Sequence, residues 1–406
     1  MVSGKKLEQD QHIRLSSATY EEILAGQASD VYFERSLSAA SRVKHEAHVV
    51  AEVTLSGPLD PWVNFSGLNE VMSLLLGKGV DVYSIPEGTI IGPRDMVGNP
   101  VPFMRIEGNY DDFGEFETSI LGFICQSTGI STYSTKIREI LGKTPFFSFG
   151  IRRMHPAISP MIDRAAYVGG ADGVSGILGG KLIGQKPVGT MPHALSLIFG
   201  DDKAWEMTVK AAGKEGVKTV LIDTFMDEKF AAIKAATMFP DLDYIRLDTP
   251  SSRRGNFANI VREVRWELDL RGFNHVKIMV SGGLKLENLQ ELKAAGAESF
   301  GIGTSIASAH PYDFAMDIVE LNGSPLTKRG KHSGRKNLLR CSSCRSTLSV
   351  PSSKSSSTCR CGGKMENILV KMLDGGKLVG PYDNPDAIRA RALGELEAMQ
   401  KVAQCL

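Results

Sequence analysis

Apolar residues follow two different spacings along this chain, and segments with one spacing alternate with segments with the other. Between about residues 113 and 305, short apolar runs typical of buried strands alternate with longer segments in which apolar residues recur every three or four positions. The predicted strands are Phe146–Phe149, Gly173–Ser175, Pro187–Gly189, Thr219–Ile222, Tyr244–Leu247, Ile278–Val280 and Phe300–Ile302. The predicted helices include Ser159–Val168, Asp202–Ala212, Lys229–Ala236, Asn256–Leu270 and Leu286–Ala295. This alternation predicts an α/β fold with a parallel sheet, closed into an irregular (β/α) barrel.

The segments before and after the alternation predict two further, smaller domains. Short strand patterns over residues 47 to 56 and 80 to 107 flank a helical pattern over 68 to 76. Helices are also expected over 20 to 25, 29 to 42 and 386 to 402. The predicted domains are an N-terminal α/β sandwich domain (1–115), the barrel (116–325) and a C-terminal domain (326–406).

Small and hydroxyl-bearing residues follow the last two predicted strands of the alternation. Ser281, Gly282 and Gly283 come after one strand, and Gly303, Thr304 and Ser305 come after the next. Loops of this kind offer backbone N–H groups, and the loops after the last strands of a barrel form its usual phosphate site. The alternative is two ordinary tight turns, but two such loops in succession favour phosphate binding.

Aspartate residues follow the two strands that come before these loops. Asp223 ends the strand 219–222 and Asp248 ends the strand 244–247, so both are expected at the carboxyl edge of the sheet. Each aspartate alone would be read as a helix cap. Together, beside two phosphate loops, they favour a divalent cation such as Mg²⁺ near a phosphorylated substrate.

Composition narrows the class of protein. With 406 residues, 42% of them hydrophobic, the chain can bury more than one core. The formal net charge of +1 gives no overall electrostatic basis for nucleic-acid binding. The N-terminus has no apolar signal-peptide core, and no apolar run is long enough to span a bilayer, so we expect a cytoplasmic protein without membrane contact.

Four of the six cysteines cluster in a segment of unusual composition. Residues 324 to 365 contain ten Lys or Arg and no Asp or Glu. Within them lie Cys341, Cys344, Cys359 and Cys361, in two short knuckles fourteen residues apart. This layout predicts a structural zinc ribbon over about 338–366, because four thiolates leave no open position for catalysis. A nucleic-acid-binding ribbon is the alternative from another class, but no aromatic residue lies between the basic ones.

Four segments carry a resemblance to a known family. Residues 146–156, 184–194, 221–225 and 246–249 closely resemble, in order, motifs of the nicotinate phosphoribosyltransferase family, and the likeness extends over about residues 15 to 335 and the terminal helix. The ribbon is similar to that of the shorter prokaryotic members. The resemblance implies a type II phosphoribosyltransferase that joins nicotinate to 5-phosphoribosyl-1-diphosphate, with an active site completed by the second subunit of a homodimer.

The resemblance also implies residue roles. The implied catalytic residues are Arg152, His193, Asp223 and Asp248. Arg152 is the first candidate for the cation that stabilises the departing diphosphate, and Lys186 and Arg246 are the next candidates. Phe149 would stack on one face of the pyridine ring, and Tyr32 of the second subunit on the other. The implied substrate-binding residues are Tyr32, Phe149, His155, Asp172, Lys181, Thr190, Arg246, Ser281, Gly282, Gly283, Gly303 and Thr304.

Three questions stay open at the level of sequence. His193 occupies the position of a histidine that is phosphorylated in ATP-coupled relatives, although contact with diphosphate explains it equally well. Asp172, if it faced the ring pocket, would repel nicotinate and favour nicotinamide. Quinolinate is the runner-up substrate, because Arg152, Arg153 and Lys181 could bind its second carboxylate, but the zinc ribbon and the Thr-Met-Pro-His motif at 190–193 point away from it.

Overall fold

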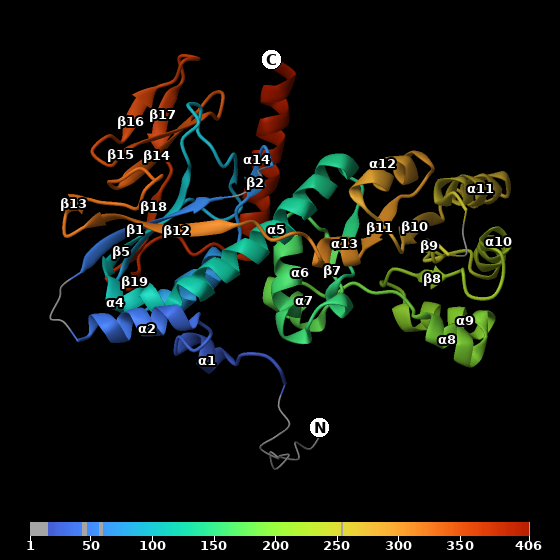
Figure 1. Cartoon of the computed structure of the whole chain (residues 1–406). Coiled ribbons are helices and arrows are strands. Elements are labelled where there is room, and N and C mark those ends of the chain that lie inside the picture. Colours follow the sequence, from blue (N-terminus) through green and yellow to red (C-terminus); the bar gives the residue numbers. More distant parts are fainter. Residues whose placement is uncertain (1–14, 43–46, 57–59, 253–254, 406) are drawn as a thin grey trace, which may run out of the picture.

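The computed structural model describes residues 15–42, 47–56, 60–252 and 255–405 of the chain (Figure 1). A seven-stranded antiparallel sheet forms one end of the molecule, in the order β13-β12-β1-β5-β3-β18-β19. Its strands are β1 (His48–Leu55), β3 (Asp81–Ser84), β5 (Pro102–Asn109), β12 (Phe314–Leu321), β13 (Ser324–Pro325), β18 (Val370–Asp374) and β19 (Lys377–Leu378). The sheet therefore combines strands from before and after the central alternation.

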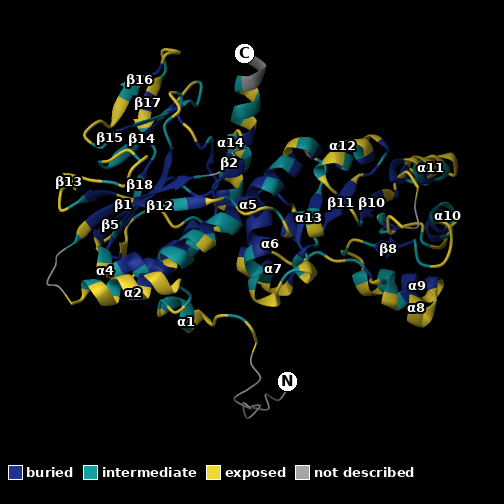
Figure 2. Cartoon of the chain, in the orientation of Figure 1, coloured by how far each residue is buried: buried dark blue, intermediate teal, exposed yellow. Residues whose placement is uncertain are grey.

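A six-stranded parallel sheet forms the other part, in the order β7-β6-β11-β10-β9-β8. Its strands are β6 (Phe146–Ser148), β7 (Gly173–Val174), β8 (Thr219–Leu221), β9 (Tyr244–Leu247), β10 (Lys277–Ser281) and β11 (Ser299–Ile302). Most residues of these strands are buried, and the helices around them expose their outer faces (Figure 2). No pairing joins β7 to β8 among the described strands, so the α/β class is confirmed and closure of the barrel is not.

Helices surround both sheets. The helices of the parallel part are α6 (Ser159–Val168), α7 (Ile177–Ile183), α8 (His193–Phe199), α9 (Asp201–Ala212), α10 (Glu228–Met238), α11 (Phe257–Leu270), α12 (Leu286–Ala294) and α13 (Thr304–Ala307). The other helices are α1 (Tyr20–Leu24), α2 (Val31–Ala40), α3 (Leu68–Leu75), α4 (Tyr110–Phe113), the long α5 (Glu117–Leu141) and α14 (Pro385–Cys405). None of the described helices combines the length and apolarity that a membrane span requires.

The predicted strands and helices of the central alternation are confirmed with one exception. Pro187–Gly189 is not a strand. Its Val188 N–H donates a bond of 2.8 Å to the Val174 carbonyl of β7, but Pro187 has no N–H group to extend the ladder. This segment belongs instead to a loop between α7 and α8, two helices too short to leave a clear periodicity.

The cysteine segment folds as a small four-stranded sheet in the order β15-β14-β17-β16. Its strands are β14 (Lys336–Cys341), β15 (Thr347–Pro351), β16 (Ser356–Thr358) and β17 (Lys364–Asn367). A further antiparallel pair joins β2 (Val63–Asn64) to β4 (Ile90–Ile91). Both strands come from the segment between β1 and β5.

The basic run before the ribbon is neutralised inside the fold. Lys328 and Lys331 both pair with the buried Asp317 of β12. Arg335 pairs with carboxylates of β5 and β12, and Lys336 lies 2.9 Å from Glu52 of β1. These cations therefore form ion pairs with acidic residues of the antiparallel sheet.

A buried ion pair joins the antiparallel sheet to the parallel part. Glu87, in the turn after β3, accepts bonds of 2.6 and 3.0 Å from Arg164 of α6. Burial alone raises the pKa of Glu87, but Arg164 and the N–H of Gly67 lower it below its usual value. The Glu87 carbonyl also accepts a bond of 2.6 Å from Arg391 of α14. One turn thus holds three parts of the molecule together.

Arg164→Met should destabilise the protein strongly, because it leaves the Glu87 carboxylate buried without its counter-ion. We expect a loss of about 3–5 kcal/mol in the free energy of unfolding, measured by chemical denaturation. The double variant Glu87→Gln with Arg164→Met should recover part of this loss, since Gln keeps an acceptor for Gly67.

The matched control is Lys203→Met, which breaks an exposed pair with Glu206 on α9. Such a pair contributes at most about 1 kcal/mol. Equal losses in Lys203→Met and Arg164→Met would show that the buried pair has no special part in holding the domains together.

Candidate active site

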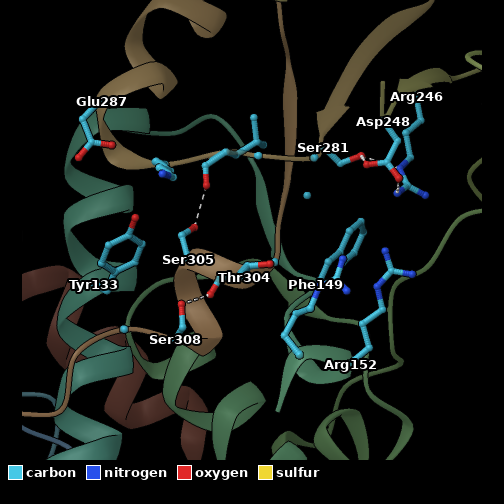
Figure 3. Close-up of a pocket in the computed structure, with 18 of the residues that line it drawn as sticks. Tyr133, Phe149, Arg152, Arg246, Asp248, Ser281, Glu287, Thr304, Ser305 and Ser308 are labelled. Atoms are coloured by element: carbon cyan, nitrogen blue, oxygen red, sulfur yellow. Dashed lines mark hydrogen bonds and ion pairs between the residues drawn. The ribbon is translucent and has the colours of Figure 1, made fainter. Parts of the chain in front are cut away.

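A cavity of about 610 Å³ opens at the carboxyl ends of β6, β9, β10 and β11 (Figure 3). Parallel strands place these ends at one edge of the sheet, so residues distant in sequence meet there. The lining residues that were predicted from sequence are Phe149, Arg152, Arg246, Asp248, Ser281, Gly282, Gly283, Gly303 and Thr304. The structure therefore gathers in one cavity nine of the sixteen predicted catalytic and substrate-binding residues.

The guanidinium group of Arg246 bonds three other residues around the cavity. Its Nη2 donates to Asp248 at 3.0 Å, its Nε to Ser281 at 2.9 Å and its Nη1 to Thr190 at 2.6 Å. The Ser281 hydroxyl in turn donates to Asp248 at 2.8 Å. The two carboxylate oxygens of Asp248 thus each accept a bond, which fixes the side chain before any ligand binds (Figure 3).

Glycine is required in the loops because the neighbouring side chains come so close. Gly282 has a φ of +82°, and a Cβ there would lie 3.0 Å from the Asp248 carboxylate. A Cβ on Gly301 would meet the ring of Phe149 at 2.5 Å. The backbone of the loop after β10 can therefore approach a ligand, and Gly301, inside β11, leaves room for the ring of Phe149.

A second cavity of about 470 Å³ adjoins the first and shares Phe149, Arg152, Arg246 and Asp248 with it. Its other wall is the loop from Gly189 to Ala194, which includes Thr190 and His193. The two cavities form one cleft, with the glycine loops on one side of Arg246 and His193 on the other.

Asp223 lies beneath His193 at the end of β8. The Nε2 atom of His193 is 3.2 Å from Oδ1 of Asp223, whose side chain is only 1% exposed. Burial raises the pKa of Asp223, His193 opposes this, and the charge of Asp248 raises it further. Both carboxylate oxygens are buried, and the described residues give neither of them a hydrogen bond of good geometry. Such oxygens could coordinate a divalent cation or accept a hydrogen bond from a protonated imidazole.

Four of the predicted binding residues lie outside this cleft. His155 caps a 3-10 turn, where its Nδ1 accepts from Ala157 N–H, and Lys181 is exposed on α7. Tyr32 is 55% exposed on α2, at the far end of the molecule (Figure 1). Asp172 precedes β7 and is bound by Arg138 and Arg389 at 2.5 and 2.9 Å. Asp172 therefore does not face the ring pocket, and the argument for nicotinamide disappears.

Several lining residues had no signal in the sequence. Tyr133 of α5 and the exposed helix-start residues Lys285 and Glu287 line the cavity, as do Ser308 and His310 after α13. None of them follows a strand directly, so a search of strand ends could not find them. Arg153, which sequence reasoning connected with quinolinate, also lines the cavity.

Comparisons with known proteins found two family models and several solved structures that are similar to this chain. The chain matches the N-terminal domain model of quinolinate phosphoribosyl transferase over residues 30–128 and the C-terminal domain model over residues 130–317. A crystal structure of nicotinate-nucleotide pyrophosphorylase from Pyrococcus furiosus is 44% identical, covers 96% of this chain and 99% of that one, and has a TM-score of 0.90. Human nicotinic acid phosphoribosyltransferase, 17% identical with a TM-score of 0.70, supports the fold alone.

Curated relatives are similar over part of their length. Nicotinate phosphoribosyltransferase pncB1 of Mycobacterium tuberculosis is 27% identical over 282 residues, which are 66% of this chain and 60% of the relative. Nicotinate phosphoribosyltransferase of Bacillus subtilis is 30% identical over 235 residues, 56% of this chain and 46% of the relative. The chain therefore spans about half to three fifths of these two relatives.

Asp223→Asn should stabilise the protein at neutral pH. The folded protein holds a proton on Asp223 more tightly than the unfolded chain does, so ionisation of Asp223 costs stability as the pH rises through its raised pKa. Asn cannot ionise, and we expect a melting temperature about 2–4 °C higher than that of the wild type. The gain should vanish in acid, where Asp223 is already protonated.

Asp227→Asn serves as the control, because Asp227 is exposed and its side chain caps α10, a role that Asn also fills. Melting curves of both variants between about pH 4 and pH 8 make the comparison. A destabilised Asp223→Asn variant at neutral pH would contradict a raised pKa at this position.

Proposed function

Because the chain belongs to the quinolinate phosphoribosyl transferase family of type II phosphoribosyltransferases, we propose that it transfers a phosphoribosyl group from 5-phosphoribosyl-1-diphosphate to nicotinate. The products are nicotinate mononucleotide and diphosphate, and the role is salvage of nicotinate for NAD synthesis. The observation that carries the proposal is the Arg246–Asp248–Ser281 network between two glycine loops in one cleft. The names of the curated relatives support nicotinate as the substrate.

In this proposal, different parts of the cleft bind the 5-phosphate, the ribose and the diphosphate of the donor substrate. The 5-phosphate binds the backbone N–H groups of the loops Ser281–Gly283 and Gly303–Thr304. The ribose hydroxyls bind Asp248, which Arg246 and Ser281 already hold in place. The diphosphate extends toward Arg152 and His193 on the other side of the cleft.

The bond exchange needs little proton transfer. The pyridine nitrogen of nicotinate attacks C1 of the ribose with its own lone pair, and the bond from C1 to the diphosphate oxygen breaks. Negative charge then grows on the diphosphate, where the guanidinium of Arg152 can stabilise it. Mg²⁺ bound with the donor would neutralise the same charge, and the buried oxygens of Asp223 fit such a cation.

The charge of the cleft favours an acidic acceptor. Arg152, Arg153 and Arg246 line it, and Phe149 offers a ring face for stacking. Nicotinate brings one carboxylate to these cations and nicotinamide brings none. Quinolinate is the second candidate, because the matching family models carry its name and Arg152 and Arg153 are adjacent at the cavity.

We also propose a homodimer. Exposed apolar side chains gather on the short helices α7 and α8, among them Ile177, Leu178, Leu182, Leu197, Ile198 and Phe199. Val31 and Tyr32 are exposed on α2, at the other end of the chain's structure. Contact between α2 of one copy and the cleft side of another would bring Tyr32 to the ring pocket and cover these apolar surfaces.

The four-cysteine cluster is proposed to hold a structural zinc ion. Its sulfur atoms all lie within 4.8 Å of one another, and two pairs are 3.5 Å apart. Tetrahedral zinc with bonds of about 2.3 Å needs sulfur atoms roughly 3.8 Å apart, so the cluster fits the ion. The N–H of Ser343 points to Cys341 Sγ, as in a metal-binding knuckle.

The substrate is tested by supplying the purified protein with phosphoribosyl diphosphate, Mg²⁺ and nicotinate, nicotinamide or quinolinate, each with and without ATP. We expect mononucleotide from nicotinate. Asp248→Ala should lower kcat more than about tenfold, or ~1.4 kcal/mol, because it removes the acceptor for the ribose. Asp202→Ala, at an exposed position of α9, is the control and should leave kcat unchanged. Mononucleotide from quinolinate or nicotinamide alone would contradict the nicotinate assignment.

The zinc proposal is tested by elemental analysis, which should find about one zinc per chain. Cys344→Ser should lose the metal and lower the melting temperature, because a structural zinc stabilises the ribbon. Cys125→Ser, at a half-buried cysteine outside the cluster, should keep the metal. A wild-type protein without zinc would rule out the assignment.

A further inference from the structure

A cavity of about 400 Å³ lies where the ribbon, α14 and the β2–β4 region meet. Its walls come from Pro61 and Trp62, from residues 90 to 96, from the second half of the first cysteine knuckle, and from Glu395, Met399 and Val402 of α14. It shares no lining residue with the candidate active cleft. Its volume is in the range of pockets that hold small organic ligands.

Positive charge is in excess in this cavity. Arg94, Arg340 and Arg345 line it, against the carboxylates of Glu395 and Asp95. Asp95 is already occupied, since its oxygens accept from the N–H groups of Val97, Asn99 and Ser349. Glu395 alone therefore faces both Arg340 and Arg345, and Arg94 has no ion-pair partner in the part of the chain that the structure describes.

The two arginines of the ribbon are incompletely bonded. Arg340 reaches Glu395 at 2.6 and 3.1 Å and the Ile90 carbonyl at 2.9 Å, but its Nε is buried without a partner. Arg345 is about three quarters buried, contacts Glu395 and also leaves a buried Nε unbonded. A guanidinium has five N–H donors, so one carboxylate cannot satisfy two such groups. Because both Nε atoms are buried, a second anion in the cavity would bind the remaining Nη donors of Arg345, whose side chain is 26% exposed.

The backbone at Arg345 adds a separate observation. Its φ is +62°, one of two positive φ values among the described residues other than glycine. Glycine adopts this conformation at least cost, whereas an L side chain is disfavoured there by roughly 1 kcal/mol. The knuckle nevertheless carries arginine at this position, and the strained turn directs the side chain to the cavity wall and Glu395.

The other wall of the cavity is apolar. Trp62, Ile90, Ile91, Met96, Met399 and Val402 form it. A ligand that satisfies both walls has an anionic group for the arginines and a flat, partly apolar ring for the wall with Trp62. We propose that this cavity is a second ligand site, which binds a mononucleotide through its phosphate at Arg345 and Arg94 and its ring beside Trp62. The site does not depend on the proposed transferase activity.

Binding is tested on the intact, metal-loaded protein by titration with AMP, with nicotinate mononucleotide and with inorganic phosphate. The two nucleotides distinguish an adenine nucleotide from the proposed product of the enzyme. Calorimetry gives the affinity, and tryptophan emission reports on Trp62, with the Trp62→Phe variant identifying its share of the signal. We expect a saturable change in Trp62 emission with at least one of the nucleotides.

Arg345→Gly is the decisive variant, because glycine suits the positive φ and the fold should be retained. It should weaken the nucleotide response at Trp62 by at least about tenfold. Arg360→Ala, in the second knuckle and outside the cavity, is the control and should leave the response unchanged. A response unaffected by Arg345→Gly, a response to inorganic phosphate alone, or no response to either nucleotide would overturn the proposal. Each readout is independent of transferase turnover, so a failed assay with nicotinate leaves the result interpretable.

Discussion

The position of the Arg246 side chain governs the candidate active site. Its guanidinium group joins β9, from which it comes, to Ser281 at the end of β10 and to Thr190 in the loop before α8. Because it is largely buried, it must be paired, and Asp248 supplies the opposite charge two residues later. This network fixes the strand ends in the absence of any ligand. For the proposed transfer of a phosphoribosyl group, such preorganised groups are favourable, since they need not reorient as charge develops.

The sequence predicted the parallel part well because each of its elements is locally amphipathic or wholly apolar. The ranges 159–168 and 244–247 were predicted to the residue. Only the first part of helix α5 showed a helical pattern in the sequence, because its later buried face is rich in Ser and Thr, including Thr128 and Ser131, which bond the backbone of β2 and its neighbour Ser66. The antiparallel sheet was beyond reach for another reason: β12 and β18 return to it from distant parts of the chain, and no local pattern encodes that pairing.

The sequence predicted correctly which residues after strand ends meet in the cleft, but it misplaced residues that precede a strand or lie on helices. Asp248 and Ser281 follow parallel strands, and topology alone brings them together. Asp172 also adjoins a strand, but it precedes β7 and so lies at the opposite edge, where it binds two arginines. Whether a polar residue comes before or after a parallel strand thus decides which edge of the sheet it reaches. Tyr133 reaches the cavity from a helix, a route that strand-end reasoning does not include.

The last helix, α14, connects the cysteine segment to the rest of the fold. At its start, α14 is held to the parallel part, where Asp386 accepts from Tyr167 and Arg389 donates to Asp172. One turn further along, Arg391 donates to the carbonyl of Glu87, whose side chain forms the buried pair with Arg164. Further on, Glu395 binds Arg340 and Arg345 of the ribbon. A change in the ribbon is therefore connected through one rigid helix to the junction of the two sheets. A helix is a stiff connection because hydrogen bonds join its successive turns, whereas a loop has no such regular bonds.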